Sequence, residues 1–378
     1  MKFCSRPFKY VYLDNYKGDL ALCQWMQWDS IYIGNLFKQP FDAIWNGEKA
    51  KKLRERIRQG DYSICRLEAC PLLQNKSLPE KSAKYIREYP TLKSPKIVNL
   101  AYDFMCNQYC ETCRDKKWKP LLPQYKNYME KIHKQIAPVL NNAERITTSG
   151  HGDPFASPYM MKVLRKLTPS SNDLQLLIET NGVYCDKKHW EQIHHLHNCH
   201  IELVITINSF NRFTYNHISR GGNYEKLIDN LAYISKLRKE YIINKLDFSL
   251  VIQDRNFREI PDFIKRCLEQ YQADSVVLKP VYQWGTMPED VFWFKDVLNP
   301  LHPYHPEYLE ILDHPVMQDK RVFNFGGRTL HPARQYPGAG KCNSISPELL
   351  RLRNENYQLR VEIERLINAA TAFAKKTQ

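Results

Sequence analysis

The sequence predicts an α/β protein built around a parallel β-sheet, and three observations indicate this class. Between residues 96 and 290, short β-type runs and amphipathic helical runs alternate six times, as in strand–helix units joined by right-handed crossovers. The 378 residues, 43% hydrophobic and 25% charged, are enough for two domains with a buried core. Polar residues gather where the expected strands end, and ligands bind at the carboxyl ends of the strands in such sheets.

Residues 1–75 precede these units and are expected to form a small cysteine-rich module. A β-hairpin is expected at 11–23, and a helix at 41–59 that ends at Gly60. The four cysteines of the module are Cys4, Cys23, Cys65 and Cys70. Four thiolates suit an iron–sulfur cluster without an open position, and they suit zinc equally well on ligand identity.

A proline-containing linker is expected at 76–95, and the strand–helix units follow at 96–290. The expected strands are 97–100, 145–148, 174–178, 201–207, 246–252 and 275–278. The expected helices are 124–136, 157–167, 186–197, 224–239 and 257–270. Residues 291–345 are expected to form an irregular lid or linker.

The last segment, 346–378, is expected to form a coiled-coil helix that begins at Ser346 and Pro347. Its apolar heptad positions carry one polar residue, Asn356, which favours a two-stranded register. The a and d positions are Leu349, Leu352, Asn356, Leu359, Ile363, Leu366, Ala370 and Phe373. The helix therefore predicts a homodimer or a partner protein, while docking on the chain's own core stays open.

Hydropathy, cysteine content and net charge indicate which cellular compartment and which partners to expect. No run approaches the ~18 apolar residues that a membrane span needs, and the first residues lack the apolar region of a signal peptide. We therefore expect a cytoplasmic protein without a membrane partner, in which eleven cysteines serve metal or redox chemistry. The net charge of +14 favours acidic partners, with basic runs at 49–58 and 114–119, but no nucleic-acid-binding motif accompanies it.

Cys106, Cys110 and Cys113 follow the first expected strand of the sheet in the order C-x3-C-x2-C. Three thiolates at this spacing can ligate three irons of a cubane [4Fe–4S] cluster, which leaves the fourth iron open to a small molecule. A structural zinc site or three unrelated thiols are the alternatives. A tetrahedral zinc site needs a fourth ligand, and no His lies close by in the sequence.

This spacing resembles the signature of the radical S-adenosylmethionine (SAM) superfamily. The resemblance implies that SAM binds the open iron and that an electron, drawn from an external reductant, cleaves SAM to methionine and a 5′-deoxyadenosyl radical. That radical would abstract a hydrogen atom from the substrate. The six strand–helix units are similar to the partial (β/α)6 TIM-like barrel of that superfamily.

The N-terminal module resembles the SPASM-type auxiliary cluster domain of radical SAM enzymes. The matching features are Cys-x-x-Pro-Phe at 4–8, the hairpin ending in Cys23, Ile-Gly-Asn-Leu at 33–36, Ile-Trp-Asn at 44–46, the Arg-rich helix and the pair Cys65/Cys70. The resemblance implies an auxiliary [4Fe–4S] cluster that conducts electrons, with zinc as the alternative. The module departs from the usual pattern because it comes first and supplies only four cysteines.

The strand ends carry motifs similar to the SAM-binding elements of the same superfamily. Gly150, Gly152 and Asp153 resemble its GGE motif, in which a carboxylate and backbone carbonyls accept hydrogen bonds from the ammonium group of SAM. Asn181 belongs to a TNG element. The remaining candidates for cofactor contacts are Thr206, Asn208, Arg220 and Gln253, of which Arg220 suits the SAM carboxylate.

The resemblance implies a SAM-cleaving enzyme that acts on a peptide, a protein or a sugar-like molecule. Radical modification of RNA is an alternative that only the positive charge suggests. A non-enzymatic iron–sulfur electron carrier or assembly partner is a second alternative, and it predicts clusters without SAM cleavage.

Overall fold

The computed structural model describes residues 1–327, except 27–31, 67–69, 115, 117, 119–122, 149 and 284–286, and only positions 355, 359 and 366 beyond them. Residues 1–329 form one compact unit and residues 330–378 a second. The predicted coiled coil therefore lies almost wholly outside the described residues and stays a prediction.

One ten-stranded sheet organises the first unit, in the order β10-β9-β8-β7-β6-β5-β4-β1-β2-β3. The strands from β4 to β9 are parallel, which confirms the predicted α/β class. Their bounds are β4 (Ile97–Leu100), β5 (Arg145–Thr148), β6 (Gln175–Thr180), β7 (His200–Thr206), β8 (Lys245–Ile252) and β9 (Ser275–Pro280).

The N-terminal module contributes strands to this same sheet. Strand β1 (Tyr10–Leu13) pairs in parallel with β4, in a register that places Tyr12 opposite Asn99. Strands β2 (Asp19–Ala21) and β3 (Gly34–Asn35) then continue the sheet antiparallel. Strand β10 (Val322–Asn324) extends the opposite edge by pairing with β9. The sheet is therefore continuous across the linker expected at 76–95.

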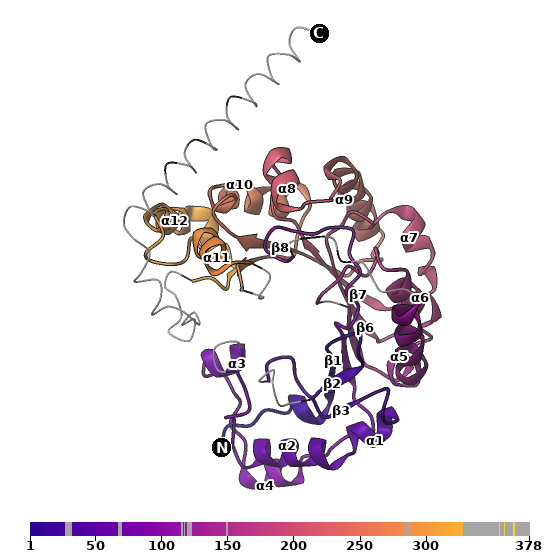
Figure 1. The fold of residues 1–378 in the computed structure, drawn as a ribbon. Helices are drawn as coiled ribbons and strands as arrows, with labels where there is room; N and C mark the ends of the chain where they lie inside the picture. The colour runs from indigo at the N-terminus through magenta and orange to yellow at the C-terminus, as the bar shows by residue number, and fades with distance from the viewer. Residues whose placement is uncertain are drawn as a thin grey trace. The chain divides into compact units, whose positions relative to one another are not determined.

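Helices follow the parallel strands, and those from α5 to α10 lie on the outer side of the sheet (Figure 1). Their bounds are α5 (Gln124–Asn141), α6 (Pro158–Lys166), α7 (Lys187–Glu191), α8 (Arg212–Ile218), α9 (Tyr224–Lys239), α10 (Ile260–Lys265), α11 (Glu289–Lys295) and α12 (His305–Leu312). The short helical turns are η1 (Arg6–Phe8), η2 (His194–Leu196), η3 (Phe257–Glu259), η4 (Arg266–Gln270) and η5 (Pro315–Gln318). The module adds α1 (Phe41–Trp45), α2 (Glu48–Arg58) and α3 (Pro71–Gln74), and the segment expected as a linker contains α4 (Ala83–Glu88).

The single helix predicted at 41–59 is wrong in one respect, because Asn46 and Gly47 divide it into α1 and α2. Gly47 has an extended backbone and caps the start of α2. Asn and Gly are poor residues for a helix interior, so the chain turns here before helix formation resumes. The helix predicted at 257–270 is confirmed as a continuous helical segment, in which the 3-10 turn η3, the α-helix α10 and the π-helical turn η4 follow one another without a gap.

The sheet curves, and its two faces differ. The Nζ atom of Lys279 in β9 lies 2.7 Å from Oε1 of Glu179 in β6, although β7 and β8 lie between these strands. Three strand spacings of about 4.8 Å would separate β6 and β9 in a flat sheet by more than these side chains can bridge. The inner face is therefore concave, and the helices cover the outer face, where Ile178 and Leu203 are fully buried (Figure 1).

Candidate active site at the carboxyl edge of the sheet

The loop that follows β4 brings the thiols of Cys106, Cys110 and Cys113 together. Each of the three lies within electrostatic range of the other two. Burial raises the pKa of Cys106 to about 12 and also raises the pKa of Cys110. Such thiols ionise readily when a bound metal supplies the opposite charge, which is the condition for ligation.

The spacing of these thiols fits a cluster better than a single ion. Within the described residues, no three His, Cys, Asp or Glu side chains converge tightly enough to hold one metal ion. A cubane cluster requires a wider separation of the thiolates, because each thiolate binds a different iron. The donor set therefore fits a [4Fe–4S] cluster held by Cys106, Cys110 and Cys113.

Two glycines of the loop after β5 allow that loop to lie directly against the cysteine loop. A Cβ on Gly150 would lie 2.6 Å from the Cβ of Ala101, and Gly150 has a φ of +107°. A Cβ on Gly152 would lie 2.5 Å from the carbonyl oxygens of Asp103 and Met105. The sequence led us to expect that these glycines approach SAM. In the structure, they approach the backbone of the loop that carries the predicted cluster ligands.

Asp153 fixes this loop in place. Its backbone N–H donates to Met105 O at 2.8 Å. Its Oδ2 accepts from Thr180 Oγ1 and Asn181 N, both at 2.7 Å, and its Oδ1 accepts from the backbone N–H groups of Phe155 and Ala156. Four donors occupy the carboxylate, so the structure gives Asp153 a positioning role, and its direct contact with SAM stays a prediction.

Asn181 reaches a ligand thiol. Its Nδ2 donates to Asn107 Oδ1 at 2.8 Å and lies 3.6 Å from Cys106 Sγ. Its Oδ1 accepts from the backbone N–H of Val183 at 3.0 Å, which assigns the amide orientation. Asn181 therefore supplies a donor to the sulfur of a cluster ligand.

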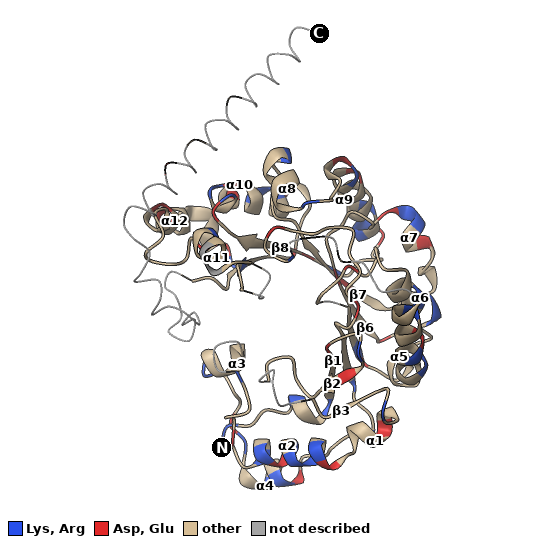
Figure 2. Ribbon diagram, viewed as in Figure 1, with Lys and Arg blue, Asp and Glu red and all other residues tan. Residues whose placement is uncertain are grey.

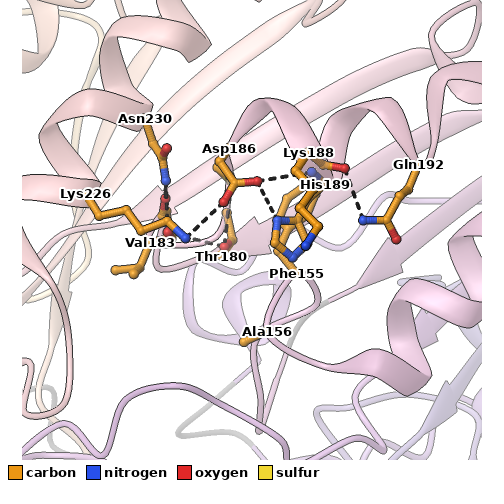
Figure 3. A network of polar contacts seen from close by, with 12 residues as sticks. Phe155, Ala156, Thr180, Val183, Asp186, Lys188, His189, Gln192, Lys226 and Asn230 are labelled. Atoms are coloured by element: carbon orange, nitrogen blue, oxygen red, sulfur yellow. Dashed lines mark hydrogen bonds and ion pairs between the residues drawn. The ribbon is translucent and has the colours of Figure 1, made fainter.

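Figure 3 shows the polar network that holds the turn after β6 in place. The Asp186 carboxylate lies 2.6 Å from His189 Nδ1 and 2.9 Å from Lys226 Nζ. Asn230 Nδ2 donates to the carbonyls of Gly182 and Val183, both at 2.9 Å. Contacts from α7 and α9 thereby immobilise the turn from which Asn181 extends.

Arg220 binds the cysteine loop from the other side. Its Nε donates to Tyr109 O at 3.1 Å and its Nη2 to Arg114 O at 2.9 Å, while its guanidinium lies over the Tyr109 ring. The Tyr109 N–H donates back to Arg220 O at 2.9 Å. Two of the three guanidinium nitrogens are thus already engaged, and the predicted contact with the SAM carboxylate is left to the third.

Two buried amides have polar atoms without partners. Gln253, which follows β8, is 0% exposed, and neither its Nε2 nor its Oε1 has a hydrogen-bond partner within the described residues. Asn208, which follows β7, has an unpartnered Oδ1. Leaving such groups unpaired costs about 1–3 kcal/mol each, so a polar ligand is expected here. Both residues fit the predicted SAM site. Thr206 instead pairs with Ser249, with 2.8 Å between the hydroxyl oxygens.

An ion-pair network at the cysteine loop was not predicted. Glu111, which lies between Cys110 and Cys113, is 2.5 Å from the buried Lys295 Nζ of α11. Lys295 also lies 3.8 Å from Asp254, and Arg255 lies 3.8 Å from Glu111. Burial alone would raise the pKa of Glu111, but the charge of Lys295 holds it below its usual value. Glu111, an acid within the cysteine motif, was the sequence signal for this network. Its partner Lys295 could not be predicted, because it lies in the segment 291–345 that was expected to be irregular.

His151, in the loop after β5, packs against the cysteine loop. Its ring stacks on Phe104 with 4.4 Å between centroids and 5° between planes. Its Nε2 lies 3.9 Å from Oδ1 of Asp14, which follows β1. The module and the loop after β5 therefore meet beside the cysteine loop.

The thiols of Cys4, Cys23, Cys65 and Cys70 form a second group, and each lies within electrostatic range of the other three. Burial raises the pKa of Cys4 to about 11 and that of Cys65 to about 12. Arg6 Nη1 lies 4.0 Å from Cys23 Sγ. Four thiolates next to a cation fit an iron–sulfur cluster without an open position.

The fold and the two thiol groups define a class of protein, an α/β protein with two groups of cysteines that fit iron–sulfur clusters. A model of the SPASM family, an iron–sulfur cluster-binding domain, matches residues 4–71. A model of the radical SAM superfamily matches residues 104–267. The chain belongs to the radical SAM superfamily as an enzyme of that class, with a SPASM domain N-terminal to the radical SAM domain. These domains imply a [4Fe–4S] cluster, SAM and an auxiliary iron–sulfur cluster, which confirms the predicted cofactors.

Individual known proteins are more distantly similar. The GTP 3′,8-cyclases of Lactiplantibacillus plantarum and Limosilactobacillus fermentum are each 25% identical over 173 residues, or 44% of this chain. The chain spans about half the length of these curated relatives, 49% in each case.

Two solved structures are similar to part of this chain. Coproporphyrinogen III oxidase of Escherichia coli, a radical SAM enzyme, has a TM-score of 0.38 and 16% identity, covering 50% of this chain and 44% of that chain. Native anSMEcpe with bound AdoMet has a TM-score of 0.36 and 12% identity, covering 57% of this chain and 62% of that chain.

Among the described residues, no helix is long and apolar enough to cross a membrane.

Proposed function

We propose that this enzyme cleaves SAM reductively and abstracts hydrogen from an organic substrate on the concave face of a partial (β/α)6 barrel. The observation that carries the proposal is the convergence at one edge of the sheet. The three-thiol loop is held between Gly152 and Arg220, and the unpaired amides of Gln253 and Asn208 follow neighbouring strands. When bound, the cluster and SAM supply a 5′-deoxyadenosyl radical.

The residues of this chain supply position and hydrogen bonds. Cys106, Cys110 and Cys113 would hold the cluster, and Asn181 would donate to the sulfur of Cys106. Gln253 and Asn208 would hydrogen-bond the polar groups of SAM, which would satisfy their unpaired atoms. We propose that the auxiliary cluster is a [4Fe–4S] cluster held by Cys4, Cys23, Cys65 and Cys70, and that it passes electrons.

The substrate class is open to a direct test. We propose a peptide, a protein or a sugar-like molecule, and the concave face offers the Glu179–Lys279 pair, about one third exposed, to polar groups of any of these. The two curated relatives act on GTP according to their names, so GTP joins the substrate panel. We further propose an external reductant, a cytoplasmic location, and pairing through the helix expected at 346–378.

The deciding experiment is an anaerobic assay of 5′-deoxyadenosine with dithionite and SAM. We expect about eight irons per chain, as two four-iron clusters. The triple variant Cys106→Ala/Cys110→Ala/Cys113→Ala should lose half of the iron and all SAM cleavage. The quadruple variant of Cys4, Cys23, Cys65 and Cys70 to Ala should lose the other half and still cleave SAM. Iron without SAM cleavage in the wild-type chain would overturn the enzyme proposal and leave the electron carrier.

A further inference from the structure

A cavity of about 370 Å³ lies along helix α2, in the N-terminal module. Its lining residues are Lys51, Lys52, Arg54, Glu55, Arg58 and Thr91. Figure 2 shows that Lys and Arg gather on this helix. Four cations and one carboxylate line the cavity, and that carboxylate, on Glu55, lies 3.6 Å from Arg58 Nη1. Lys51 Nζ lies 2.9 Å from Oε1 of Glu48, which does not line the cavity, so Lys52 and Arg54 are the lining cations for which the described residues provide no ion pair.

Arg54 is the unusual member of this set, because it is a buried cation without a counter-charge. It is 1% exposed, and its Nε and Nη1 donate to the carbonyls of Pro7 and Trp45 at 2.9 and 2.8 Å. Its third nitrogen, Nη2, has no partner within the described residues. Burial, followed by the charge of Arg58, lowers the pKa of Arg54 to about 10. A buried charge is costly unless an opposite charge is near, so this cavity favours an anion.

We infer that this cavity binds a phosphate group. A phosphate monoester or inorganic phosphate carries more negative charge than a carboxylate and offers several strong acceptor oxygens, which matches a lining of four Lys and Arg donors and one carboxylate. The cavity belongs to the auxiliary module and shares no residue with the carboxyl-edge site. The inference therefore does not rest on the proposed radical chemistry.

The test is isothermal titration of the holoprotein with inorganic phosphate at low ionic strength, beside acetate as the carboxylate. Phosphate should bind and acetate should not. Lys52→Gln should weaken phosphate binding about threefold, and Glu55→Gln should strengthen it by a similar factor, as expected for partly exposed charges. Both side chains are exposed on the helix surface, so these variants keep the fold.

Lys49→Gln is the matched control. Lys49 is exposed on the same helix, and its substitution changes the net charge equally, but it does not line the cavity. Its phosphate affinity should equal that of the wild type. Absent phosphate binding, equal binding of acetate, or equal losses for Lys49→Gln and Lys52→Gln would each overturn the inference.

Discussion

Asn181 Nδ2 lies 3.6 Å from the Sγ atom of Cys106, and this contact joins the turn after β6 to a predicted ligand of the SAM-binding cluster. Hydrogen bonds to cluster sulfurs are among the factors that set reduction potentials, because they stabilise the more negative, reduced state. Asn181→Ala should therefore lower the potential of this cluster. A hydrogen bond of about 1 kcal/mol corresponds to about 40 mV for a one-electron couple. An EPR-monitored redox titration measures the shift, and the auxiliary cluster is the internal control, since its potential should not change.

Gly152→Ala should prevent assembly of the SAM-binding cluster. The added Cβ would lie 2.5 Å from two carbonyl oxygens of the cysteine loop, so the loop must move. About four irons per chain should be lost, and the auxiliary cluster should remain. Gly60→Ala is the control, because nothing lies within 4 Å of the Cβ added at Gly60, although the φ of Gly60 is +78°. Iron counts equal to those of the wild type in Gly152→Ala would refute this role.

Arg6→Gln should lower the reduction potential of the auxiliary cluster. Its guanidinium lies 4.0 Å from Cys23 Sγ and over the ring of Tyr10, at 4.6 Å. A positive charge beside the ligands stabilises the reduced cluster, which carries one more negative charge than the oxidised one. Lys9→Gln removes a charge from the same module away from the thiols and should leave the potential unchanged. The same EPR titration compares the two variants.

Lys295→Met should destabilise the protein strongly. It would leave Glu111 and Asp254 without the buried ammonium that compensates them, and loss of one partner of a buried pair costs about 3 kcal/mol. Anaerobic urea unfolding measures this loss. The double variant Lys295→Met/Glu111→Gln should recover part of the stability, because one uncompensated charge is gone. No recovery would show that Lys295 acts through packing alone.

His302 should make the protein less stable at acid pH. Burial lowers its pKa to about 4, and its neutral ring is held by Nε2–H donating to Phe294 O and by Nδ1 accepting from Tyr304 N. In the unfolded state the pKa of His302 is about 6.5, so below this pH the unfolded state binds a proton that the folded state does not bind. The free energy of unfolding therefore falls as pH falls from 6.5 toward 4. Between pH 7 and pH 5 the loss should be about 2 kcal/mol. Unfolding of His302→Gln at both pH values should show a smaller loss, and equal losses would contradict this assignment.

Local patterns were sufficient to predict the six parallel strands and the longer helices of the radical SAM domain, but not the short helix α8. Helix α9 begins and ends where the sequence predicts it, at 224 and 239, because Leu227, Leu231 and Ile234 recur at helical spacing and are buried. Strand β5 agrees with the prediction for the same kind of reason, since Ile146 and Thr148 alternate toward the covered face. Such patterns are properties of neighbouring residues and need no knowledge of the rest of the fold.

The contacts that assemble the site could not be predicted in this way. The contact of Arg220 with the SAM carboxylate stays a prediction, but its donation to carbonyls of a loop more than one hundred residues earlier was not predicted. The pairing of Glu111 with Lys295 spans a still longer separation. Motifs identify which residues gather at the strand ends, but the choice between contacting a ligand and holding a loop depends on distances that only the folded chain defines.

The parallel pairing of β1 with β4 has a consequence for electron transfer. Cys4 precedes β1 and Cys106 follows β4, so the two thiol groups are attached to opposite ends of one hydrogen-bonded strand pair. Each strand contributes about 3.3 Å per residue to the separation, and the ladder between them cannot slide without breaking its backbone bonds. The paired strands thus hold the two thiol groups at a fixed separation. For the electron transfer that we propose between the two clusters, this strand pair fixes much of the distance, and a change in rate requires a change in reduction potential rather than a relative movement of the two cysteine groups.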